Sequence, residues 1–105
     1  MQVAILAGGL ATRLRPMTES MPKSMIDVEG KPFINYQLAT LRDQRVTDVV
    51  LCLGYLGEQI ERHVGDGRSF NIHIKYSYEG ERLLGTAGAL KNAEPLLHDQ
   101  FFVMY

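Results

Sequence analysis

The chain has 105 residues, of which 46% are hydrophobic and 22% charged, and its formal net charge at pH 7 is −1. This length and composition are typical of one soluble globular domain, and the near-neutral charge argues against a surface that coats nucleic acid. No apolar run approaches the roughly 18 residues that span a bilayer, and the N-terminus lacks the basic segment of a signal peptide. We therefore expect a cytoplasmic protein, in which the lone cysteine, Cys52, is a buried and reduced thiol.

The first half of the chain alternates between strand and helix patterns. A continuous apolar run at residues 3–7 predicts a strand buried on both faces of a parallel sheet. Pro32 is suited to the first turn of a helix, and apolar residues recur after it at helical spacing. Residues 48–53 form a second buried-strand run, which Gly54 ends.

The second half continues the alternation. A short helix is predicted up to Gly65, and apolar residues that alternate with polar ones at 72–76 predict a strand covered less completely on one side. Residues 86–93 predict a helix with Thr86 as its N-cap, and the apolar run at 101–105 predicts a last strand. The order predicts an α/β fold, a three-layer α/β/α, Rossmann-like and mostly parallel sheet.

The last run, FFVMY, looks like a central strand, yet the sequence stops directly after it. In open α/β sheets the ligand crevice lies beyond the carboxyl ends of the strands, so the loop that would complete the crevice is missing. We therefore expect residues 1–105 to be the truncated N-terminal, nucleotide-binding portion of a longer domain.

The loop AGGLATRLRP, with MPKS after it, has the residues of a phosphate site. Gly8 and Gly9 let an anion approach backbone amides, Thr12 offers a hydroxyl, Arg13 a planar fork and Lys23 a point charge. Neither the dinucleotide pattern G-x-G-x-x-G nor the Walker pattern fits this loop. The glycines and the Thr-Arg pair alone leave a phosphate site and a plain glycine turn with solvated arginines equally open, and the ordered set of strand, GG, TR, P and PK favours the phosphate site.

A family resemblance distinguishes between these two readings. AGGLATRLRPMTESMPKSM resembles the signature of the nucleoside-diphosphate-sugar pyrophosphorylases, or sugar-phosphate nucleotidyltransferases. Their pattern is L-x-G-G-x-G-T-R-L-x-P-x-T, then P-K-x-M or P-K-x-L, then G-K-P, and residues 30–32 match the last element. The resemblance extends through GYLGEQI and EGERLLGTAGAL, so it covers essentially the whole chain.

The resemblance implies a reaction and a set of site residues. Family members join a nucleoside triphosphate and a sugar 1-phosphate, with Mg²⁺ present, to give a nucleotide-sugar and pyrophosphate. Arg13 and Lys23 match catalytic positions: Arg13 would hold the leaving β- and γ-phosphates with Thr12, and Lys23 would stabilise charge at the α-phosphate. Positions that match nucleotide-binding residues, with Glu79 and the 85–86 turn along the nucleobase, are Leu6, Ala7, Gly8, Gly9, Thr12, Glu79, Gly85 and Thr86.

Two departures limit what the resemblance implies. Ala11 stands where the family has a third glycine, and the aspartate that binds the metal in the family would follow Tyr105. We therefore expect no metal ligand within the sequence, no transferase activity from residues 1–105 alone, and self-association through the open sheet edge. Alternative hypotheses are a non-catalytic, nucleotide-binding regulatory module and a transferase for a non-sugar phosphate such as phosphocholine. No nucleic-acid or membrane partner is expected.

Overall fold

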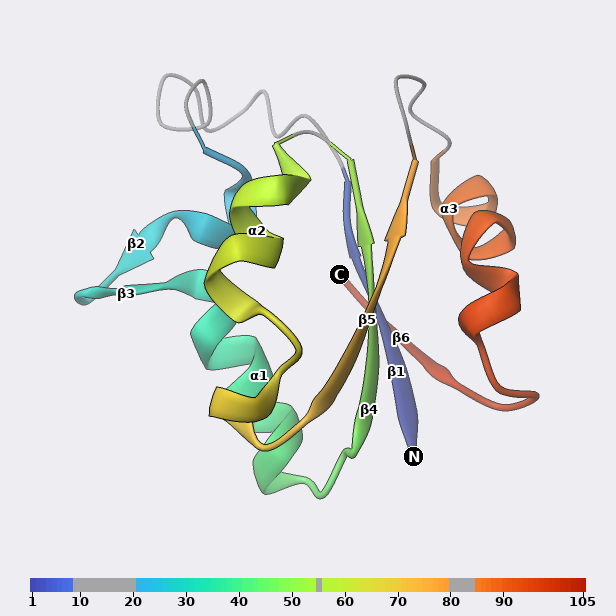
Figure 1. Cartoon of the computed structure of the whole chain (residues 1–105), viewed down its shortest axis with the longest axis horizontal. Coiled ribbons are helices and arrows are strands. Elements are labelled where there is room, and N and C mark those ends of the chain that lie inside the picture. The colour runs from blue at the N-terminus through green and yellow to red at the C-terminus, as the bar shows by residue number, and fades with distance from the viewer. Residues whose placement is uncertain (9–20, 55, 80–84) are drawn as a thin grey trace.

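Four parallel strands form the central sheet in the computed structural model, which describes residues 1–8, 21–54, 56–79 and 85–105 (Figure 1). In sheet order, the strands are β5 (His73–Tyr78), β4 (Asp48–Leu53), β1 (Gln2–Ala7) and β6 (Phe102–Met104). Every neighbouring pair in this sheet is parallel, as the apolar runs predict. Because Ala7 pairs with Leu53 and Leu53 with Tyr78, three of the strands end level with one another.

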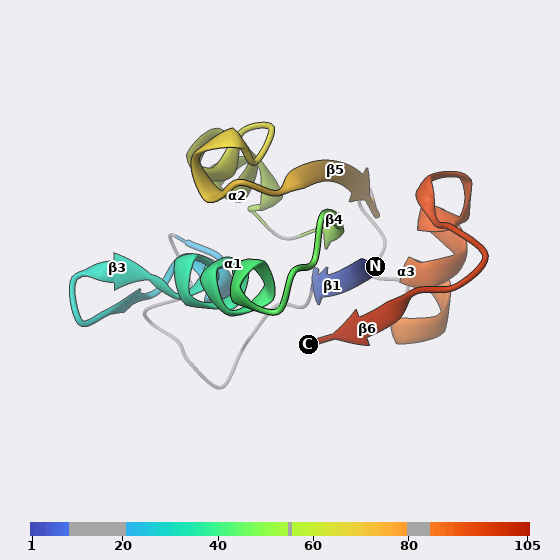
Figure 2. The same cartoon turned by 90° about the horizontal axis from the view of Figure 1, so that it is seen from below.

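Helices cover both faces of the sheet, which confirms the predicted three-layer architecture. Helices α1 (Phe33–Asp43) and α2 (Gly57–Val64) lie on one face, and α3 (Gly85–Ala93) lies on the other (Figures 1 and 2). Pro32 directly precedes α1, and Gly65 ends α2 with a φ of 62°, a conformation that glycine adopts without steric cost.

The sheet separates two apolar clusters. Val49, Leu51 and Leu53 of β4 belong to the larger cluster, which includes residues of α1 and α2, whereas Val50 and Cys52 pack with Ala89 and Ala93 of α3. Successive strand residues point to opposite faces, so β4, with its last five residues buried, contributes to both clusters. In the part of the chain that the structure describes, no helix has the length and apolarity needed to cross a membrane.

A small hairpin before α1 escapes the sequence prediction. Strands β2 (Asp27–Val28) and β3 (Lys31–Pro32) pair antiparallel, and the two residues between them, Glu29 and Gly30, have φ values of 49° and 90°. Two positive φ angles are the mark of the tight turns that join such strands. Strands of two residues are too short to give an alternating pattern, so only this turn could have indicated the hairpin.

One of the sequence predictions for the last two elements is wrong in detail. The helix expected from Thr86 begins at Gly85, so Thr86 lies within α3 and is not its N-cap. The run FFVMY forms the predicted last strand, β6, which lies at the edge of the strands that the structure describes, with Phe102 62% exposed and Val103 40% exposed.

Candidate functional site

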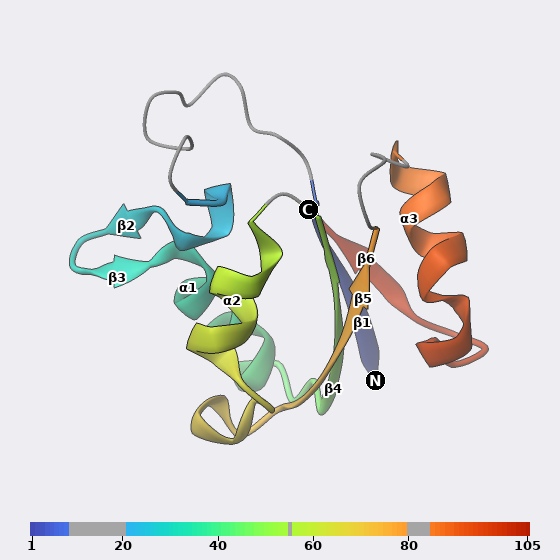
Figure 3. The same ribbon diagram turned by 45° about the horizontal axis from the view of Figure 1, so that its top comes forward.

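The candidate site lies at the carboxyl edge of the sheet, where β1, β4 and β5 end together. The next residues along the chain are Gly8, Gly54 and Glu79. The Glu79 N–H donates to the Leu53 carbonyl at 2.9 Å, which continues the ladder between β4 and β5. Figure 3 turns this edge forward and shows that α2 and α3 also begin there. Such an edge is where open α/β sheets bind ligands, and helix N-termini favour negative charge.

Glu79 packs against the backbone of the two glycines. A methyl group on Gly8 would lie 2.9 Å from Cδ and Oε1 of Glu79. A methyl group on Gly54 would lie 2.9 Å from the Gly8 carbonyl oxygen and 3.1 Å from Oε2 of Glu79. Any larger residue at these positions would therefore displace either the carboxylate or the neighbouring strand. The half-buried Glu79 thus lies over a surface made of bare backbone.

The Glu79 carboxylate also acts on the residue beneath it. Cys52, on β4, is 1% exposed, and burial first and the negative charge of Glu79 second raise the pKa of its thiol to about 11. At neutral pH the thiol is therefore protonated and a poor nucleophile. The sequence-based expectation of a buried, free cysteine is confirmed, and its place in the site is structural.

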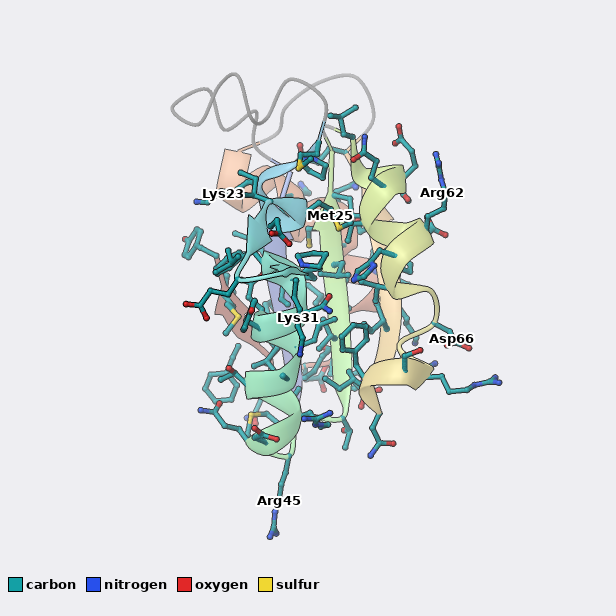
Figure 4. All side chains as sticks on the ribbon, turned by 90° about the vertical axis from the view of Figure 1, so that its left-hand side faces the viewer. Lys23, Met25, Lys31, Arg45, Arg62 and Asp66 are labelled. Carbon is teal, nitrogen blue, oxygen red and sulfur yellow. The ribbon has the colours of Figure 1, made fainter. Side chains whose placement is uncertain are left out.

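Lys23 is presented by a short, well-anchored turn. Residues Lys23–Met25 form one 3-10 turn, closed by hydrogen bonds from the Met25 N–H to the Pro22 carbonyl at 2.9 Å and from the Ile26 N–H to the Lys23 carbonyl at 3.1 Å. Pro22 is fully buried and Met25 packs on the larger core cluster, whereas Lys23 is exposed. Figure 4 shows Lys23 toward the carboxyl edge and Arg45 at the opposite end of the molecule. Lys23 has no ion pair with the described residues.

The structure brings together some of the predicted site residues. Leu6 and Ala7, both half-buried, end β1 at this edge, and Gly8 follows them against Glu79. Gly85 and Thr86 form the start of α3. The remaining predicted positions lie outside the described residues, and they are Gly9, Thr12 and Arg13.

Sequence reasoning missed the role of Gly54. It identified this glycine as the end of a strand, yet Gly54 also contacts Gly8 and Glu79 across neighbouring strands. The available signal was a glycine directly after a buried parallel strand, because such a position often permits a close approach of backbone.

Two of the described histidines, a residue type that can bind metals, lie on different elements, and each pairs with a polar side chain. His63 pairs with Asn35, its Nε2 lying 2.6 Å from Oδ1, and His73 pairs with Asp48, its Nδ1 lying 3.4 Å from Oδ1. Within residues 1–8, 21–54, 56–79 and 85–105, no group of three His, Cys, Asp or Glu side chains is placed to hold a metal ion.

Comparisons with known proteins identify the family of the chain and structures of the same fold. A family model described as nucleotidyl transferase matches residues 2–105. The chain is 41% identical to the N-acetylmuramate alpha-1-phosphate uridylyltransferase of Neisseria meningitidis and 42% identical to the mannose-1-phosphate guanyltransferase of Neurospora crassa, each over 99% of this chain. It spans 45% of the first relative's length and 29% of the second's. The crystal structure of HddC from Yersinia pseudotuberculosis, complexed with GMP-PN, superposes on 97% of this chain and 45% of its own, with a TM-score of 0.83 and 38% identity.

Proposed function

The chain belongs to the nucleotidyl transferase family, and on this premise we propose that it is the part of a sugar-1-phosphate nucleotidyltransferase that binds the nucleoside triphosphate. In the proposed reaction, a phosphate oxygen of the sugar 1-phosphate attacks the α-phosphorus of the triphosphate, and pyrophosphate leaves. The observation that most directly supports the proposal is the backbone surface of Gly8 and Gly54 at the carboxyl edge, beside Glu79. Flat backbone of this kind admits a planar nucleoside where a Cβ would exclude it.

Each residue has a distinct task in this proposal. Glu79 borders the nucleoside on the β5 side, and the backbone around Gly8 supports it from β1. Arg13 and Thr12 hold the leaving phosphates, and Lys23 approaches the α-phosphate from its turn at 23–25. Positioning and charge neutralisation supply most of the rate in transfers of this type, and this is the contribution that we propose for Arg13 and Lys23.

Mg²⁺ remains an expectation of the family resemblance. The described residues offer no group of three His, Cys, Asp or Glu side chains placed to hold a metal ion, although Mg²⁺ commonly takes only one or two carboxylates together with substrate phosphates. We therefore assign no step of the reaction to a metal held by residues of this chain.

The proposal is tested by triphosphate binding to the chain itself. Calorimetric titration with UTP, GTP, CTP and dTTP is expected to show binding of at least one of them. Lys23→Gln should weaken that binding by roughly tenfold or more, since hydrogen bonds to charged groups have about this strength. Arg45→Gln is the matched control: it removes an equal charge from the opposite end of the molecule and should leave the affinity unchanged (Figure 4). Absence of binding to all four triphosphates would refute the proposal.

Product analysis separates the proposed enzyme from the two alternatives. A longer polypeptide that continues residues 1–105 should release pyrophosphate when a sugar 1-phosphate is supplied. A regulatory module would bind triphosphate and release none, and a transferase for other acceptors would respond to phosphocholine instead.

A further inference from the structure

Two buried glutamine side chains lie beside the last strand, and they differ in how their amides are satisfied. Gln2, on β1, is 3% exposed. Its Nε2 donates to the Leu96 carbonyl at 3.1 Å, and its Oε1 accepts the His98 N–H at 2.7 Å. One side-chain amide therefore binds the carbonyl of one residue and the N–H of the second residue after it, as a neighbouring strand does in a parallel sheet.

Gln37, on α1, makes only the first of these two bonds. It is 9% exposed, and its Nε2 donates to the Tyr105 carbonyl at 3.1 Å. Its Oε1 is buried and has no donor among the residues that the structure describes. A buried acceptor without a donor has given up its hydrogen bonds to water without forming one to the protein, which is unfavourable and uncommon in folded proteins.

The hydrogen bond that Gln37 makes therefore matches the first of the two that Gln2 makes, and its Oε1 can accept one more hydrogen bond from the main chain. We propose that Gln37 is a binding site for peptide backbone, whose Oε1 accepts the N–H of the second residue after Tyr105 in a polypeptide that continues the chain. In extended backbone the carbonyl of one residue and the N–H of the second residue after it point to the same side, so one amide reaches both, as Gln2 shows.

Two further observations favour a continuing polypeptide as the occupant. Tyr105 is 76% exposed and Phe102 is 62% exposed, so the strand that Gln37 holds presents large apolar side chains to solvent. The chain also spans only 45% of the length of its Neisseria relative. Because β6 runs parallel to β1, the segment that Gln37 holds would leave toward the same edge as Gly8. This inference does not depend on the proposed function.

Two short extensions test it. In one, two alanines are added after Tyr105; in the other, an alanine and then a proline. Both add the same number of residues and the same terminal carboxylate, but proline has no N–H at the second position and favours extended backbone before it. Each extension is made in the parent chain and in Gln37→Leu, and thermal unfolding and amide hydrogen exchange are measured.

We expect the alanine–alanine chain to unfold about 4–8 °C above the alanine–proline chain, the shift that one ordinary hydrogen bond produces in a domain of this size. The amide of the second alanine should exchange about fivefold more slowly than in an unstructured peptide. In Gln37→Leu both differences should vanish. Equal melting temperatures of the two extensions in the parent chain, or free exchange of the second alanine amide there, would overturn the proposal, and neither of these results requires the Leu variant to fold.

Discussion

The contact between Gly54 and Gly8 makes the sharpest stability prediction. In Gly54→Ala the new methyl group would lie 2.9 Å from the Gly8 carbonyl oxygen, closer than an ordinary van der Waals contact of 3.4–4 Å. That oxygen belongs to the backbone where β1 ends, and the pairing of Ala7 with Leu53 holds it in place. The clash therefore cannot be relieved by rotating a side chain.

The expected cost follows from this lack of freedom. Overpacking that shifts backbone costs about 1–3 kcal/mol, whereas replacing glycine by alanine in a site that accepts it stabilises by about 0.4–1 kcal/mol. Gly54→Ala should therefore lower the free energy of unfolding by about 1–2 kcal/mol. In Gly8→Ala the three atoms nearest to the methyl group, at 2.9–3.0 Å, all belong to the end of the Glu79 side chain, so the carboxylate can move and the net change should stay below about 1 kcal/mol.

Urea unfolding of a set of double variants measures the difference. Glu79→Ala should remove the residual cost of Gly8→Ala, because the atoms in conflict are gone. The same change should leave most of the cost of Gly54→Ala, whose closest contact is with backbone. Equal destabilisation by the two glycine variants, or full rescue of Gly54→Ala by Glu79→Ala, would refute the reasoning.

Three further predictions follow from features of the described residues. Because the pKa of Cys52 is raised from 9.0 to about 11, the folded state holds this proton more tightly, so stability that is complete below pH 9 is lost as the pH rises toward 11. The loss should be about 1 kcal/mol between pH 8 and pH 10 in urea unfolding, and Cys52→Ala should reduce it. Burial also raises the pKa values of Tyr76 and Tyr78, so these phenols add a loss that begins just below pH 10 and persists in the Cys52 variant. In a longer polypeptide with transferase activity, Lys23→Ala should lower turnover by orders of magnitude in a pyrophosphate-release assay; unchanged turnover would exclude the role proposed for Lys23. Gly30→Ala should lower the free energy of unfolding by about 1 kcal/mol, although no atom lies within 4 Å of the new methyl group, because its φ is 90°; a neutral outcome in calorimetry would show that the β2–β3 turn rearranges.

The main elements of the fold could be predicted because their signals are local. The apolar run of β4 and the glycine that ends α2 each report on a few neighbouring residues. The pairing of Phe102 with Val3 could not be predicted, since it depends on which strands lie beside one another.

The site is only partly predictable for the same reason. Gly8 stands out as part of a glycine loop, and the resemblance identifies Glu79, but the contact between them depends on the register of β1, β4 and β5. The helical spacing places Gln37 on the same face as Ile34 and Leu41, but its residue type does not show what its amide binds once that face is buried.

The strand that leads into the candidate site has a consequence for the order in which the chain folds. Strand β1 is made first, yet Val3 pairs with Val49 on one side and with Phe102 on the other. Strand β4 is thus separated from β1 by about half of the chain, and β6 is separated from it by nearly all of the chain. Contacts this distant in sequence must close long loops before they contribute stability, so they form late and slowly. During synthesis on the ribosome, β4 is therefore available to pair with β1 before β6 is, because β6 is made about 50 residues later.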